Sequence, residues 1–199
     1  MAIKFQYNKT SLQDLNKQLK VRVRALPTIK NKESALRMEV KKAKDAAQAL
    51  ENQIEKSVAS YSAMSRLWNE FNTDLVKVKD VDLSIKKIAG VRIPMLEEVK
   101  FDIGEFSLFN SPAWYAEGIA IVKSLAQIGI EREFYYRTMH LLDHARRKTT
   151  QKVNLYEKVQ IPGYEEAIMK IKRFMEDEEN LSKSAQKIVK NRKMMEVSV

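Results

Sequence analysis

The sequence predicts a mainly α-helical protein. A long N-terminal helix and a long C-terminal helix are expected to form an antiparallel two-helix coiled coil, with a small β-hairpin and a shorter helical segment between them. Apolar residues recur every three or four positions from Leu12 to Val78, which is the spacing of a coiled-coil seam. A stretch near the middle alternates apolar and polar residues, as strands do. The chain has only 5 glycines and 4 prolines among 199 residues, which suits long helices.

The N-terminal helix is expected within residues 1–80, with Thr10 or Ser11 as its cap. Alternating steps of three and four from Leu12 reach 20 positions, of which 17 are apolar and 3 (Arg22, Glu33 and Ser57) are not. At about 1.5 Å per residue the repeat would extend roughly 100 Å, so much of the protein is expected to be a rod. The seam residues predicted in this helix are Leu12, Leu15, Leu19, Leu26, Ile29, Leu36, Val40, Leu50 and Ile54.

Pro27 falls inside this helical pattern. A proline in a helix interior removes one backbone hydrogen bond and clashes with the preceding turn. The apolar repeat nevertheless keeps its phase from Leu26 to Ile29, which favours a kink. The alternative is a short break before Thr28.

A connecting segment is expected over residues 81–110. Within it, apolar and polar residues alternate over 90–103, with Gly90 and Gly104 at the two ends of the stretch. This pattern predicts a small β-hairpin at 90–103. Phe106, Leu108 and Phe109 follow it and need cover from another element.

The C-terminal helix is expected over residues 111–199, because Ser111-Pro112 is a typical helix start. Pro162-Gly163 should kink or briefly interrupt it, and the basic stretch 187–193 should fray. Antiparallel pairing would bury both seams within one chain, whereas a parallel homodimer would leave the second seam without a partner. The seam residues predicted in this helix are Val153, Tyr164, Ile168, Ile171 and Met175, and the seam is expected to continue through Leu181, Ala185 and Ile188.

The formal net charge is +10. Because basic and acidic residues are interleaved along the helices, we interpret the charge as a solvated helix surface and predict no nucleic-acid partner. There is no cysteine, so a disulfide framework and a thiolate metal site are excluded. The N-terminus lacks the apolar core of a signal peptide, and no apolar run is long enough to span a bilayer. These features predict a cytoplasmic protein without a direct membrane span, which could still belong to a membrane complex.

Catalytic patterns are not found. The five glycines are too widely spaced to form a phosphate-binding loop. His140 and His144 lie four residues apart, which is a possible zinc spacing, but the glutamate that a metalloprotease needs after the first histidine is missing. We therefore predict no catalytic residue, no metal and no cofactor, and interpret Trp68 and Trp114 as packing residues.

The order of several motifs resembles the D subunit of V-type (vacuolar/archaeal-type) ATPases and ATP synthases. In the C-terminal half these are Val153-Asn154, Glu157, Ile161-Pro162, Glu165, Ile168, Ile171 and the acidic run 176–179. Asn8-Lys9-Thr10 resembles the family's opening, and the Gly90–Pro94 stretch and Ser111-Pro112 resemble its middle. The resemblance covers nearly the whole chain.

This resemblance implies a non-catalytic central-stalk rotor subunit that couples ATP hydrolysis or synthesis to the movement of protons or sodium ions. Its terminal helices would insert into a ring of catalytic and regulatory subunits. The middle of the chain would face a small stalk subunit and the coupling subunit on the membrane rotor ring, with Val91, Ile93, Val99 and Phe101 as expected contacts. The alternatives are a coiled-coil scaffold or tether unrelated to ATPases, and a helical enzyme using His140 and His144.

Overall fold

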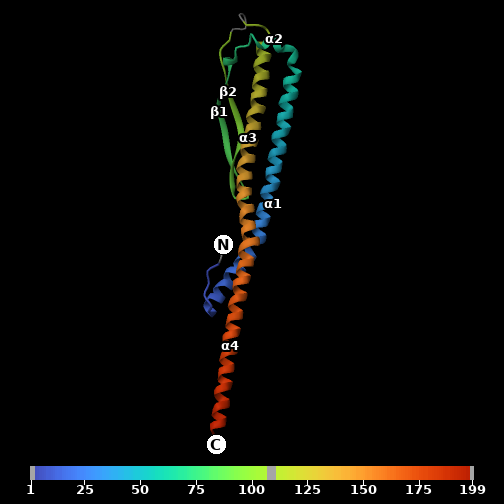
Figure 1. The fold of residues 1–199 in the computed structure, drawn as a ribbon. Coiled ribbons are helices and arrows are strands. Elements are labelled where there is room, and N and C mark those ends of the chain that lie inside the picture. Colours follow the sequence, from blue (N-terminus) through green and yellow to red (C-terminus); the bar gives the residue numbers. More distant parts are fainter. Residues whose placement is uncertain (1–2, 107–110, 198–199) are drawn as a thin grey trace. The chain divides into compact units, whose positions relative to one another are not determined.

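The computed structural model describes residues 3–106 and 111–197. It contains two long helical regions separated by an antiparallel hairpin and short helical turns (Figure 1), so the predicted fold class is confirmed. The elements are α1 (Lys9–Ser60), a 3₁₀ turn (Ser62–Met64), α2 (Ser65–Trp68), a 3₁₀ turn (Thr73–Leu75), β1 (Val76–Ile88), β2 (Val91–Ile103), α3 (Tyr115–Asn154), a π-helical turn (Leu155–Gln160) and α4 (Ile161–Val197).

The contacts within the chain divide it into two compact units. The first unit comprises Met1–Asn31 and Thr149–Val199, and the second unit comprises Lys32–Lys148. Each unit contains part of α1 and part of the C-terminal helical region.

The helix α1 runs without a break through Pro27 to Ser60. A short break before Thr28 is therefore wrong, and so is a helix that continues to Val78. The apolar repeat continues beyond Ser60 because Trp68 of α2 and the following Phe71 and Leu75 are packing residues. Phe71 and Leu75 are buried.

The predicted bounds of the hairpin, 90–103, are wrong, because this range contains only β2. The hairpin begins at Val76, and β1 pairs with β2 in antiparallel register. Gly90 lies in the turn instead of opening the first strand. Ala89 (φ +48°) and Gly90 (φ +82°) both adopt positive φ, as the two central residues of a tight type I′ hairpin turn must. Register shifts between Val78 and Asp80 and between Asp82 and Leu83 interrupt the pairing.

The helix α3 begins at Tyr115, a few residues after the predicted start. The amide of Tyr115 donates to the carbonyl of Pro112, 3.0 Å away, so Pro112 lies in a turn before the helix. Phe106 is half-buried, and its ring centroid lies 6.5 Å from that of Tyr115. Leu108 and Phe109 lie outside the described residues.

Three elements of the second unit share one apolar core. Leu36 of α1, Ile93 of β2 and Leu142 of α3 are buried against one another. Ile88, Ala89 and Val91 from the hairpin pack at its edge. In Figure 1 the hairpin lies beside α3, as this core requires.

An aromatic cluster fills the end of the second unit where α2 and the start of α3 meet. Trp68, Phe71, Trp114 and Tyr115 have neighbouring ring centroids 5.3–5.7 Å apart, which is the usual range for aromatic pairs. A Cβ at Gly118 would lie 2.8 Å from the Trp114 ring and 3.2 Å from that of Phe71, so only glycine fits there. Trp68 and Trp114 are packing residues, as predicted.

We expect Leu36→Ala to lower the free energy of unfolding by about 2–5 kcal/mol, because Leu36 is fully buried and its truncation leaves a cavity. Met38→Ala is the matched control: Met38 is 60% exposed, so its effect should stay within about 0.5 kcal/mol. Urea unfolding of the full chain measures both, and equal effects would contradict the core described above.

Asp143 of α3 should give the stability a defined pH dependence. Its carboxylate accepts hydrogen bonds from Nε of Arg146 (2.8 Å) and Nε of Arg147 (2.7 Å). The hydrogen bond from Arg146 is the main cause that lowers the pKa of Asp143, against a smaller opposing effect of burial. Because the folded pKa lies below the unfolded value of about 4, the stabilisation is complete above that value and is lost as the pH falls through the folded pKa.

We therefore expect Asp143→Asn to reduce stability at neutral pH. The difference from the unchanged chain should shrink as the pH falls below about 4. Denaturant unfolding over a pH series measures it, and a difference that stays constant in acid would contradict this assignment.

Candidate functional site

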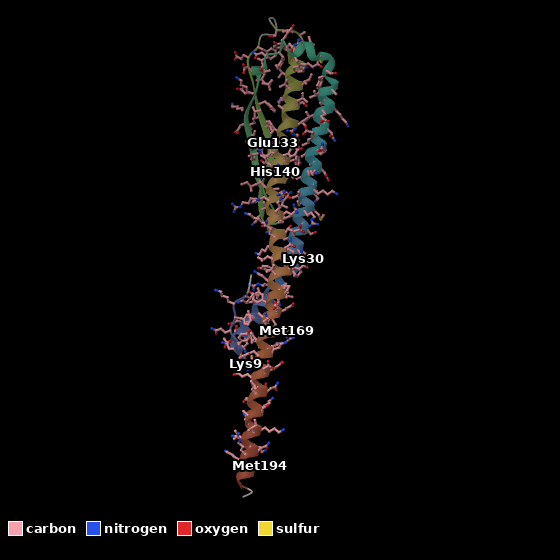
Figure 2. All side chains as sticks on the ribbon, viewed as in Figure 1. Lys9, Lys30, Glu133, His140, Met169 and Met194 are labelled. Carbon is pink, nitrogen blue, oxygen red and sulfur yellow. The ribbon has the colours of Figure 1, made fainter. Side chains whose placement is uncertain are left out.

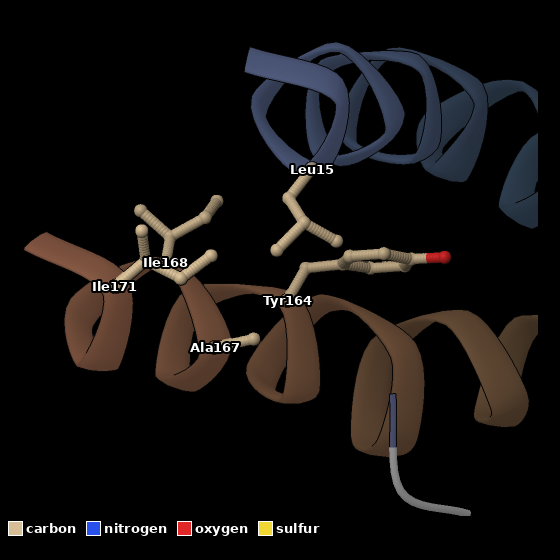
Figure 3. Packing of buried hydrophobic residues seen from close by; sticks show 5 residues of the cluster. All are labelled: Leu15, Tyr164, Ala167, Ile168 and Ile171. Carbon is tan, nitrogen blue, oxygen red and sulfur yellow. The ribbon is translucent and has the colours of Figure 1, made fainter. Parts of the chain in front are cut away.

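The first unit is held together by a seam between the start of α1 and α4. Leu15 is buried against Tyr164, Ala167, Ile168 and Ile171, and Figure 3 shows its side chain directed between those of Tyr164 and Ile168. The half-buried residues packed against this cluster are Ile3, Phe5, Leu12, Leu19 and Met175. Seven of the predicted seam residues are thus brought together here.

Polar contacts define the direction of the two helices in this unit. The hydroxyl of Tyr164 donates to Oε1 of Gln18 (2.7 Å), and Nε of Arg22 donates to Oε1 of Gln160 (2.7 Å). As the residue number rises along α1 it falls along its partner, so the helices run antiparallel. The Arg22 guanidinium also lies 4.5 Å from the centre of the Tyr164 ring, where a cation–π attraction is expected.

The π-helical turn directly before Pro162 interrupts the α-helical pattern, as predicted from Pro162-Gly163. A proline has no amide hydrogen, and its ring crowds the carbonyl four residues earlier, so a wider turn there relieves the clash. Two side chains of this turn reach α1: Glu157 accepts from Nζ of Lys30 (2.6 Å) and Gln160 accepts from Arg22. Both contacts lie within the first unit and add polar links beside its apolar seam.

The helices of the second unit are also antiparallel. Arg132 of α3 forms an ion pair of 2.5 Å with Glu51 of α1, and Leu142 packs against Leu36. Val40 packs at the edge of that core. Of the other predicted seam residues in the chain, Val153 is buried, whereas Leu26, Ile29, Leu50 and Ile54 are half-buried.

The residues expected to contact a stalk partner are placed differently from one another. Ile93 is buried in the core of the second unit, and Val91 packs against that core, so neither presents its side chain as a free surface. Phe101 is half-buried beside Lys123 of α3, whose ammonium lies 5.5 Å from the ring centre, and Val99 is half-buried. The exposed apolar residues of the hairpin are instead Val78, Leu83, Ile85, Met95 and Ile103.

The end of α4 is a second exposed surface. Every described side chain from Glu176 to Met194 is exposed, and Figure 2 shows them standing out from a single helix as far as Met194. The helix nevertheless continues to Val197, so the predicted fraying at 187–193 is not seen. Its exposed apolar residues are Leu181, Ile188, Val189 and Met194.

Within the described ranges 3–106 and 111–197, the two histidines do not form a site that could support catalysis or bind a metal ion. His140 and His144 are both exposed, and no group of three or more His, Cys, Asp or Glu side chains there could hold a metal ion. None of the helices in the described part of the chain is long and apolar enough to cross a membrane.

These features define an antiparallel coiled-coil protein with a β-hairpin inserted between its two helical regions. A family model described as the D subunit of ATP synthase matches residues 11–191. The chain therefore belongs to the family of ATP synthase D subunits.

Curated relatives, each named as the D subunit of a V-type ATP synthase, agree with this membership. The protein from Borreliella burgdorferi is 30% identical over 191 residues, covering 94% of each chain. That from Chlamydia pneumoniae is 28% identical over 183 residues, covering 89% of this chain and 87% of the relative. That from Chlamydia muridarum is 31% identical over 157 residues, covering 76% and 77%.

We expect Tyr164→Phe to lower the free energy of unfolding by about 1 kcal/mol, because the hydrogen bond to Gln18 is lost from a part-buried position. Tyr135→Phe is the control, since Tyr135 is exposed and should change stability by less than about 0.5 kcal/mol. Urea unfolding measures both. If Tyr164→Phe were as neutral as Tyr135→Phe, the hydrogen bond would not contribute to the seam.

Proposed function

We propose that this chain is the non-catalytic central-stalk rotor of a V-type ATPase or ATP synthase. It would couple ATP hydrolysis or synthesis in a catalytic ring to the translocation of protons or sodium ions. Membership of the family of ATP synthase D subunits supports this assignment. The scaffold or tether unrelated to ATPases is not favoured, because the family match covers nearly the whole chain.

The free end of α4 is the observation that carries the proposal. Leu181 is 72% exposed and Ile188 is 55% exposed, although a helix in water normally gains most of its stability by packing an apolar face. The segment from Glu176 to Val197 would extend roughly 30 Å at the usual rise. It therefore has both the length and the apolar residues to insert into a surrounding ring of subunits.

The charges on this end also suit an isolated helix. The run 176–179 is acidic and the stretch 187–193 is basic, so the exposed surface of this segment is strongly charged. Glu179 and Lys183 form an ion pair of 2.7 Å one turn apart, which adds a small stabilisation. The segment can thus stay helical before a partner covers it.

Rotation would couple the ring to the stalk through asymmetry. A single asymmetric stalk cannot contact three equivalent catalytic interfaces alike, so each interface has a different balance of open and closed states and a different nucleotide affinity. Turning the stalk by a third of a revolution exchanges these states. No chemistry is required of the stalk itself, which agrees with the lack of a glycine-rich phosphate loop in the sequence.

The partners proposed are the catalytic and regulatory subunits of the ring, a small stalk subunit and the coupling subunit of the membrane rotor ring. The chain would lie on the cytoplasmic side, peripheral to the membrane. Copurification under mild detergent from the native cells tests this assignment. Recovery of a nucleotide-binding ring together with membrane-ring components is expected, whereas recovery of the chain alone or with unrelated proteins would overturn it.

We expect the double variant Leu181→Ser and Ile188→Ser to abolish the coupled ATPase activity of the assembled complex. Both side chains are exposed, so the stability of the isolated chain should change by less than about 0.5 kcal/mol for each substitution. Val58→Ser with Met38→Ser is the control, because these α1 residues are similarly exposed and lie in the second unit, outside the free end. Full coupled activity in the Leu181/Ile188 variant would contradict the role of this end.

A further inference from the structure

The outer face of the hairpin carries an apolar patch that is largely exposed to solvent. Ile85 is 74% exposed and Leu83 is 51% exposed. Their cross-strand partners are Pro94 and Leu96, both half-buried. The other face of the same hairpin supplies Ile88, Val91 and Ile93 to the core. Because Pro94 and Leu96 also line a cavity shared with α1 and α3, Leu83 and Ile85 are the members of the patch that project into solvent.

A cluster of positive charge borders this patch. Lys87 and Arg92 lie directly opposite each other on the two strands, between the patch and the turn, and both are exposed. Like charges in directly opposed positions destabilise a hairpin. Lys32 adds a third cation at the turn, since its Nζ would lie 3.5 Å from a Cβ at Gly90.

Some hairpin lysines have a carboxylate partner, whereas Lys87 and Arg92, like Lys79 and Lys86, have none among the described residues. Lys100 on the same hairpin pairs with Asp82 at 2.6 Å, and Lys77 pairs with Asp74 at 3.4 Å. Within the described residues, Lys32, Lys87 and Arg92 form no ion pair with a carboxylate. Lys87 and Arg92 repel each other beside an exposed apolar patch. A partner surface with both aliphatic side chains and carboxylates would therefore be complementary to this part of the hairpin.

We propose that the patch of Leu83, Ile85, Pro94 and Leu96, with Lys87 and Arg92 at its border, binds an acidic amphipathic helix from another subunit of the rotary complex. This inference rests on the proposed function. It adds which residues of this chain make one of the contacts and what kind of partner segment they bind. The carboxylates of that helix would lie over Lys87 and Arg92, and its aliphatic residues would cover Leu83 and Ile85.

The dimensions fit one helix. Two strands about 4.8 Å apart, with their side chains, present a face about as wide as a helix of about 10 Å diameter. From Leu83 to Lys87 the strand extends roughly 13 Å, which corresponds to between two and three helical turns. Apolar residues at successive turns and carboxylates at one end would match this spacing.

Photo-crosslinking in the assembled complex tests the contact. Ile85 is replaced by p-benzoylphenylalanine in the full chain, the complex is purified from its native cells, and the crosslinked peptide is identified by mass spectrometry. The expected product is a peptide of another subunit with apolar residues at helical spacing and several Asp or Glu residues. A crosslink to a second copy of this chain, to lipid or to a peptide without carboxylates would overturn the proposal, as would no crosslink.

Charge reversal then tests the border. The double variant Lys87→Glu and Arg92→Glu keeps two like charges opposite each other, so the repulsion within the hairpin is preserved while its attraction for carboxylates is reversed. We expect the yield of the Ile85 crosslink to fall about tenfold, equivalent to about 1.4 kcal/mol. Lys41→Glu with Lys44→Glu is the matched control: both are exposed lysines of α1, and the yield should not change.

The outcomes separate this contact from the proposed function. If the unchanged chain does not assemble into an ATPase complex, the proposed function fails and this inference fails with it. If the complex assembles but the Lys87/Arg92 variant crosslinks as well as the control, the acidic helix is wrong and the rotor assignment stands.

Discussion

The structure depends on one interaction, the antiparallel packing of a narrow apolar stripe of α1 against the C-terminal helical region. In the first unit this stripe is Leu15 against Tyr164, Ile168 and Ile171, and in the second unit it is Leu36 against Leu142. Hydrogen bonds such as Tyr164 to Gln18 fix the register. Because each helix is buried only along this stripe, most of its circumference remains available to other proteins.

That constraint also explains which surfaces are left uncovered. The part of α4 beyond Met175 has no stretch of α1 beside it in the first unit, so its apolar residues are exposed. The hairpin contributes one face to the core through Ile93 and leaves Leu83 and Ile85 in solvent. A protein that folded to function alone would rarely expose such residues together in these places. Both surfaces are readily understood in a component of a larger complex.

Much of the fold could be predicted because the 3.5-residue repeat reports directly on helix packing. The predicted seam residues from Leu12 to Ile54 and from Val153 to Met175 are buried or half-buried, whereas Leu181, Ala185 and Ile188, which continue the repeat, are exposed. The end of α1 could not be predicted, because Trp68, Phe71 and Leu75 stay in phase with the repeat although they lie beyond α1, in α2 and the segment after it. The strand β1 was hidden by the register shift after Val78, which breaks the alternation of polarity. The burial of Ile93 could not be predicted either, because alternation shows that a strand has two faces without showing which one is covered.

The free end of α4 is proposed to turn inside a catalytic ring. The chain contains no cysteine, so Ile188→Cys introduces a single thiol that can be joined by a disulfide to a cysteine placed on the inner surface of the ring. The account predicts that oxidation stops ATP turnover by the assembled complex and that reduction restores it. Unchanged turnover with the disulfide fully formed would contradict it, because a rotor fixed to the ring cannot turn.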